Sequence, residues 1–268
     1  MTARLDDPST AGRFAALVRV GHPRRRPLRS PLVLDVVFGL CNLASFAVLT
    51  HWLVDTGPAR AATFGFVAVG VAALLQVQVA AGQGVARTQD ALRAGVLEWT
   101  LCGPVRPVVV ALADGVAPTV QGAIRCALYL ALAVLLLGVP VSGADWWGVA
   151  VLLLTGTLVT WAICIGCTAL TIAAPAGAAV ARVGLAALGL VSGVFAPLSQ
   201  LPAPLAAAGE VLPTHLAIAG LRAALGGAPW AGTWIALAPT AVLTLLLALG
   251  AYQLAVRVAR HRGGLSRV

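Results

Sequence analysis

The residues of this sequence whose types could support chemistry are two paired cysteines, four histidines and the serine of Ser192-Gly193. Cys164 and Cys167 have the C-x-x-C spacing that redox and zinc sites use. They lie inside a long apolar segment with no histidine nearby, so close packing of small side chains between helices explains them better. The histidines, at positions 22, 51, 215 and 261, show no metal-ligand spacing. The sequence therefore predicts no metal site.

Ser192-Gly193 could belong to an intramembrane serine protease, which needs a Gly-x-Ser-Gly segment and a histidine on a later span. The residues before Ser192 are Leu190-Val191, and the last apolar segment contains no histidine. Both requirements of nucleophilic catalysis are therefore missing. The carboxylates Asp35 and Asp114 are predicted near the inner edges of spans and none lies at mid-span, which weighs against a proton- or sodium-coupled carrier.

Lysine is absent from the chain, and all 18 basic residues are arginines. Without lysine there can be no P-loop, no kinase-type ATP site and no Schiff-base chemistry. We therefore expect no enzyme and no ATPase site in this chain, and any ATP that drives it must be bound by another polypeptide.

The composition indicates whether water or lipid surrounds the folded chain. Hydrophobic residues make up 60% of it and charged residues 10%, and its mean hydropathy is +0.94. A soluble domain carries about 25% charged residues, so this chain cannot cover a globular surface. Lipid must replace water around most of it. The expected fold class is an all-α membrane protein.

Six transmembrane helices are predicted, because about 20 apolar residues cross the hydrocarbon of a bilayer. A basic N-terminal segment with an amphipathic interface helix precedes them at 1–31, and a basic cytoplasmic tail follows at 257–268. The six-helix transmembrane domain covers 32–256. Its predicted spans are 32–53, 61–83, 115–137 (with an earlier start possible and a bend at Pro118), 147–173, 183–198 and 234–256.

The arginines fix the expected orientation. Nearly all of them fall in the two terminal segments or in loops on the side that these segments share, and only Arg60 and Arg222 fall on the other. By the positive-inside rule, both termini are cytoplasmic and the protein lies in the cell membrane as a multi-pass chain. Arg125 lies within a span. A nucleic-acid groove would need arginines and stacking aromatics on one soluble face, which this distribution does not provide.

The predicted cytoplasmic loop 84–114 contains a short amphipathic helix. Leu92, Val96 and Trp99 recur at helical spacing, and Gly103-Pro104 would end the helix. Two interpretations remain open for it. The apolar face could rest on the membrane interface, or it could dock a soluble partner.

The segment 199–229 lies between the fifth and sixth spans and is apolar but rich in proline. Proline breaks the helical hydrogen-bond ladder, and broken backbone at membrane depth survives only inside protein or beside water. We expect a broken re-entrant helical hairpin that dips into the outer leaflet. A lipid-facing loop is the alternative.

These two stretches resemble the type 2 ATP-binding-cassette exporter permeases, the membrane subunits of drug-resistance and polysaccharide-export systems. Gly95-Val96-Leu97-Glu98-Trp99 and Pro104-Val105-Arg106 are similar to the family's Gly-Thr-Leu-Glu loop and Pro-x-Arg turn. The outer segment is similar to the family's Ser-Gly-x-x-x-Pro, Leu-Pro, Leu-Pro and final Arg pattern. The matching outer residues are Ser192, Gly193, Pro197, Leu201, Pro202, Leu212, Pro213 and Arg222.

The resemblance implies two permease chains, identical or different, driven by two separate ATP-binding subunits that hold ATP and magnesium. It implies that the cytoplasmic loop contacts those subunits through Arg93, Leu97, Glu98, Trp99, Pro104 and Arg106. It also implies an exit gate in the outer segment, formed by Ser192, Gly193, Phe195, Pro197, Pro202, Pro213 and His215. This chain itself would hold no cofactor.

The expected cargo is amphipathic or hydrophobic, such as a drug, an antibiotic or a lipid-like molecule, because few polar side chains line the spans. The rival hypothesis is a membrane protein that works without ATP. It would be a secondary transporter, an intramembrane enzyme or an assembly factor.

Overall fold

The structure is a computed structural model that describes residues 58–95, 106–137 and 143–261, with isolated positions between 37 and 48. Every regular element among these residues is helical. Four helices are long and apolar enough to cross a membrane: α3 (Pro58–Arg93), α5 (Pro107–Leu137), α6 (Trp146–Ala173) and α10 (Ala231–His261). The predicted all-helical class is confirmed, and these helices agree with a multi-pass membrane protein.

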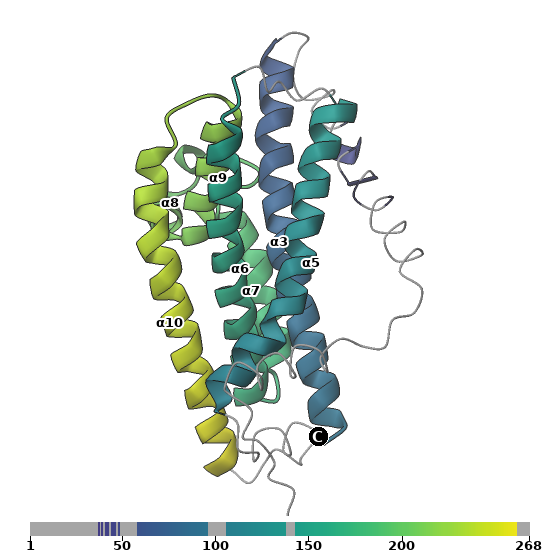
Figure 1. The fold of residues 1–268 in the computed structure, drawn as a ribbon, viewed down its shortest axis with the longest axis vertical. Coiled ribbons are helices and arrows are strands. Elements are labelled where there is room, and N and C mark those ends of the chain that lie inside the picture. Colours follow the sequence, from purple (N-terminus) through teal and green to yellow (C-terminus); the bar gives the residue numbers. More distant parts are fainter. Residues whose placement is uncertain are drawn as a thin grey trace, which may run out of the picture.

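Helix α6 is the centre of the bundle. It contacts α3, α5, α7, α9 and α10, and the ribbon shows the long helices aligned around it (Figure 1). Leu152, Val159 and Ile165 of α6 are fully buried against these neighbours. Its threonine hydroxyls bond to carbonyls one turn earlier in the same helix. Such bonds satisfy polar side chains without a partner from another helix, so α6 can be buried on most sides.

The loop predicted at 84–114 is shorter than expected. Helix α3 continues through it to Arg93, and α5 already begins at Pro107. Gly95, with a φ of +66°, follows the end of α3, and its N–H bonds to the Leu92 carbonyl; a left-handed glycine is a common helix terminator. Proline is favoured in the first turn of a helix, which fits the start of α5.

The predicted amphipathic helix is wrong at its N-terminal end. Leu92 belongs to α3, and the chain leaves the helix at Gly95, before Val96. The prediction failed because the apolar periodicity of α3 continues to its last turn. Leu92 therefore fits both the pattern of α3 and the pattern predicted for a separate helix. Residues 96–105 lie outside the described part of the chain.

The fifth predicted span, 183–198, is also wrong in its position. The helix found there is α7, Gly177–Val191. At about 1.5 Å per residue its 15 residues reach about 22 Å, which is less than the hydrocarbon thickness of about 30 Å. The span was predicted to reach Leu198, but the helix stops earlier, at Ser192 and the left-handed Gly193. Six complete spans are therefore not seen among the described residues.

The other span predictions fare better. The fourth span corresponds to α6, and the sixth to α10, which continues to His261. The second and third correspond to α3 and α5, both longer than predicted. The interface helix at 1–31, most of the first span and residues 262–268 lie outside the described residues.

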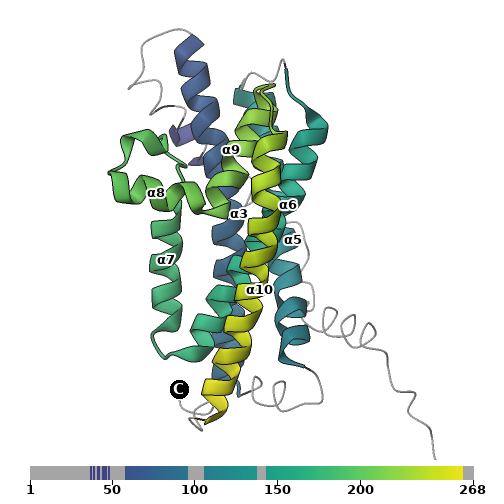
Figure 2. The same ribbon diagram turned by 90° about the vertical axis from the view of Figure 1, so that its left-hand side faces the viewer.

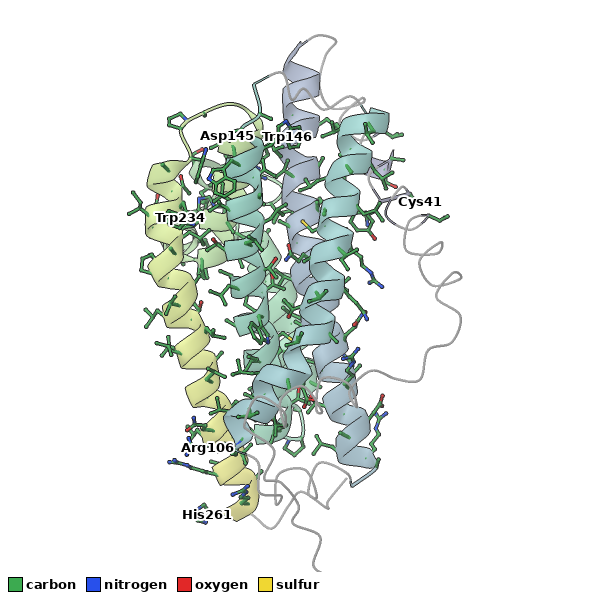
Figure 3. All side chains as sticks on the ribbon, viewed as in Figure 1. Cys41, Arg106, Asp145, Trp146, Trp234 and His261 are labelled. Atoms are coloured by element: carbon green, nitrogen blue, oxygen red, sulfur yellow. The ribbon has the colours of Figure 1, made fainter. Side chains whose placement is uncertain are left out.

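The two ends of the bundle differ in chemistry. Arg106 and His261 lie at one end, and Asp145, Trp146 and Trp234 lie toward the other (Figure 3). The outer segment consists of a 3₁₀ turn, Leu198–Gln200, followed by α8 (Ala203–Val211) and α9 (Pro213–Leu225). Figure 2 shows α8 across the end of α7.

Candidate functional site: the break between α7 and α9

The break begins where α7 ends. Ser192 is the C-cap residue of α7, and Gly193 has a φ of +70°. A side chain disfavours this left-handed conformation, so glycine is suited to the position. A Cβ on Gly193 would also lie 3.3 Å from Nδ1 of His215. The chain then runs without helix to Leu198, which leaves the backbone carbonyls of the break without helical partners.

Side chains of α9 supply those partners. Nδ1 of His215 lies 3.1 Å from the Ser192 carbonyl, and because a carbonyl only accepts, this ring nitrogen carries the hydrogen. Arg222 donates to the carbonyls of Gly193 at 2.9 Å and Val194 at 3.0 Å. His215 and Arg222 are seven residues apart, which is two helical turns, so they share one face of α9. One helix face therefore caps three consecutive carbonyls.

The guanidinium of Arg222 also joins the break to α3. It donates to the Phe66 carbonyl from Nε at 3.1 Å and from Nη2 at 2.8 Å. Its Cζ lies 3.3 Å from the centroid of the Phe66 ring, which is a cation–π contact. Among the described residues Arg222 has no ion pair with a carboxylate. Carbonyl dipoles and an aromatic face stabilise this half-buried charge instead.

A second link passes through Ser192 and Thr214, both buried. The Ser192 hydroxyl donates to the Leu188 carbonyl at 2.6 Å, and its oxygen lies 2.7 Å from the Thr214 hydroxyl. This pair holds the first turn of α9 against the last turn of α7. The break is therefore fixed by hydrogen bonds at both of its edges.

The residues predicted for the exit gate do not form one cluster. Ser192, Gly193 and His215 come together at the break. Pro213 is the first residue of α9, while Pro197 and Pro202 are exposed and precede the 3₁₀ turn and α8. Phe195 is exposed, and its ring centroid lies 5.8 Å from that of Phe46. Pro197, Pro202 and Phe195 thus belong to the outer surface of the segment.

The residues predicted to couple to an ATP-binding subunit are only partly visible. Arg93 ends α3, where its side chain lies 3.9 Å from Asp90 and both are exposed. Arg106 is exposed immediately before α5. Leu97, Glu98, Trp99 and Pro104 lie outside the described residues.

One carboxylate holds together the end of the bundle where Trp146 and Trp234 lie (Figure 3). Asp145 caps α6 by accepting from the backbone N–H groups of Trp147 and Gly148, and it accepts from Nε1 of Trp230 at 2.6 Å. These hydrogen bonds, first that of Trp230 and then that of Gly148, lower the pKa of the Asp145 carboxyl below its usual value. The Asp145 backbone N–H also donates to the Ala224 carbonyl near the end of α9. The start of α6 and the end of the outer segment are thereby held together.

The cysteine pair shows packing rather than chemistry. Cys164 is buried on α6, and its thiol donates to the Ala80 carbonyl at 3.4 Å. A Cβ on Gly84 of α3 would lie 2.6 Å from its sulfur. This contact agrees with the predicted role of small residues in close helix approach.

Sequence reasoning missed most partners of the break. Arg222 was noted within a motif but was given no role, although a lone charge in an apolar stretch is a usable signal. Thr214 was adjacent to a predicted residue and could have been included. Phe66 and Gly70 are more than 120 residues away along the chain, and nothing in their local sequence marks them.

Neither the protein-family models nor the curated proteins contain a match to the chain. What the break can do is therefore inferred from its own contacts. The break is a non-helical stretch of backbone in which the carbonyls of Ser192, Gly193 and Val194 all accept hydrogen bonds. It is held by α3 on one side and by α9 on the other.

Proposed function

We propose that this chain is the transmembrane permease subunit of an ATP-binding-cassette exporter of type 2. In this proposal two permease chains and two separate ATP-binding subunits move an amphipathic or hydrophobic substrate out of the cell. The sequence motifs support this family, and the break between α7 and α9 lies where those motifs do.

The observation that carries the proposal is the capping of residues 192–194 by one face of α9. Irregular backbone at membrane depth is tolerated where protein satisfies its polar groups. An exit gate needs such an element, because a continuous helix cannot present a short, separately movable segment. The outer segment, with α8 and α9 joined to the bundle through a few named contacts, has this form.

The distribution of charge supports the orientation in this proposal. Arg87 and Arg93 lie near the end of α3, and Arg257 and Arg260 lie near the end of α10 beside His261. Arg182 donates to Gln89 of α3. Arg106 and His261 mark this end of the bundle (Figure 3). The opposite end has four tryptophans, at positions 146, 147, 230 and 234, which suit a membrane interface. The arginine-rich end would face the cytoplasm, with both termini on that side.

The same end would receive the motor subunits. Helix α3 ends at Arg93 and α5 begins at Pro107, so the segment that contains Glu98 connects two spanning helices at the arginine-rich end. A force on this segment would act on α3, and α3 contacts the break through Phe66. This gives a continuous route from a cytoplasmic motor to the outer segment.

An ATPase measurement on the complex tests the proposal. The chain is purified with its associated subunits into lipid nanodiscs, and Glu98→Ala is compared with Asp90→Ala. Asp90 provides a matched control, because its side chain is 77% exposed at the same end of the bundle and pairs only with Arg93 among the described residues. We expect Glu98→Ala to uncouple ATP hydrolysis from export and Asp90→Ala to leave both unchanged. Absence of any co-purifying ATPase would contradict the proposal.

One observation favours the rival, ATP-independent carrier. Because α5 begins at Pro107, Asp114 lies inside a spanning helix rather than at its edge, and charged residues within spans often belong to proton or ion pathways. A carrier of this type predicts transport that follows the proton gradient and stops in Asp114→Asn. ATP-dependent transport that survives Asp114→Asn would dismiss it.

A further inference from the structure

A small cavity lies inside the bundle, between α3, α6, α7 and α9. Its volume is about 30 Å³, and Ser192 and Thr214 of the break form part of its wall. Most of its lining is apolar, but Gln76 of α3 and Thr160 of α6 add two further polar side chains. All four polar residues are at least nine-tenths buried. Polar groups from four helices thus meet around one space.

Gln76 brings an amide group to the wall of this cavity. Its Nε2 donates to the Thr157 hydroxyl oxygen at 3.0 Å, while the Thr157 hydroxyl donates to the Leu153 carbonyl. Since that hydrogen is used, Thr157 can only accept from Gln76, which fixes the orientation of the amide. Oε1 of Gln76 takes no part in this hydrogen bond, and the residue is only 4% exposed.

The hydroxyl hydrogens around the cavity are already used. Thr160 donates to the Gly156 carbonyl and Ser192 donates to the Leu188 carbonyl. The Thr214 hydroxyl, 2.7 Å from the Ser192 oxygen, must therefore be the donor of that pair. What remains is a set of acceptors, namely Gln76 Oε1 and the hydroxyl lone pairs, with at most the second amide hydrogen of Gln76 as a donor.

We propose that this cavity is a binding site for a small neutral hydrogen-bond donor, and that water occupies it. A cavity needs about 10–15 Å³ and two to four polar partners to hold a water molecule, whereas purely apolar cavities stay dry. This one exceeds that volume and provides three or more acceptors. Because acceptors outnumber donors among the polar groups of the wall, anions and carboxylates are excluded. The bound water joins α3 and α6 to the first turn of α9, directly beside the break.

Hydroxyl-radical footprinting tests the site, since radiolysis of a bound water oxidises the side chains next to it. Val159 lines the cavity and Val256 does not, and each is 1% exposed. The full-length chain in lipid nanodiscs is irradiated, and the oxidation of the two valines is compared by mass spectrometry. Two variants serve as tests, Gln76→Leu, which removes the amide, and Gly156→Ala, which adds a methyl group to the wall.

Gly156→Ala is expected to fold, because the new Cβ would lie 3.6 Å from the nearest neighbour, Cβ of Ala217. We expect Val159 to be oxidised severalfold faster than Val256 in the natural chain. Both variants should bring Val159 down to the rate of Val256. Equal rates in the natural chain would show a dry cavity and overturn the proposal. Fast oxidation of Val159 that persists in both variants would also overturn it, because the water would then not depend on this site.

Discussion

The guanidinium of Arg222 occupies the space into which a side chain at Gly70 would project. A Cβ on Gly70 would lie 2.6 Å from Nη2 of Arg222 and 2.6 Å from the Val194 carbonyl oxygen. The missing side chain on α3 therefore allows α9 and the break to approach this helix closely. Arg222 then binds the Phe66 carbonyl one turn away on α3. This pair of residues, 152 positions apart, positions the whole outer segment.

Gly70→Ala should therefore destabilise the protein. The new methyl group would meet both a charged side chain and a backbone carbonyl, and the carbonyl cannot move without disturbing the break. Overpacking of this kind costs about 1–3 kcal/mol. Gly82→Ala on the same helix is the matched control, since nothing lies within 4 Å of its Cβ position. Thermal unfolding in detergent should show a lower midpoint for Gly70→Ala alone, and equal midpoints would refute the close approach.

Replacing Arg222 should lower the stability of the protein by an amount that depends on the new residue. Arg222→Ala leaves the carbonyls of Gly193 and Val194 without donors, at about 1–3 kcal/mol for each buried group. Arg222→Lys keeps the charge, but a single ammonium cannot match the planar fork that reaches three carbonyls. The expected order of unfolding midpoints is natural chain, then Lys, then Ala. A lysine variant as stable as the natural chain would show that charge alone suffices.

His215 should matter less for stability and more for transport. His215→Ala removes one hydrogen bond, to the Ser192 carbonyl, which is worth about 0.5–1.5 kcal/mol. Under the proposed function the variant should retain ATP hydrolysis by the complex and lose export, because only the outer segment is altered. His215→Asn, whose amide can still donate, should recover part of the export. Normal export by His215→Ala would argue against a gate at this position.

The Asp145 cap makes part of the stability depend on pH. Hydrogen bonds from Trp230 and from the backbone of Gly148 hold the pKa of this carboxyl below its usual value of about 3.9. A lowered folded-state pKa stabilises the protein above the unfolded pKa, and this contribution is lost as the pH falls through the folded pKa. The natural chain should therefore exceed Asp145→Asn in unfolding midpoint at neutral pH. The difference should shrink below about pH 4. A difference that does not change with pH would contradict this assignment.

Element type was predictable from the sequence, while element ends were predictable only in part. The spans at α6 and α10 could be located because their apolar runs are long and bounded by tryptophan, aspartate or arginine. The end of α3 was misplaced because a helix can carry its periodicity past the membrane edge into a loop. The end of α7 was misplaced because proline is the stronger local signal for a helix end. The helix stops before the proline, at its C-cap residue Ser192 and the left-handed Gly193.

The sequence alone predicted that lipid rather than water surrounds most of the chain. It also determined the helical class and the uneven distribution of the arginines. These follow from composition and from local patterns, since lipid exposure and helix formation depend on residues that are near one another in the chain. The tertiary structure decided which polar groups meet. Arg222, Phe66 and Gly70, or Gln76, Thr160 and Thr214, are adjacent only after packing. Hydrogen bonds between distant residues leave no periodic trace in a single sequence, because each partner satisfies a geometry that the other helices create.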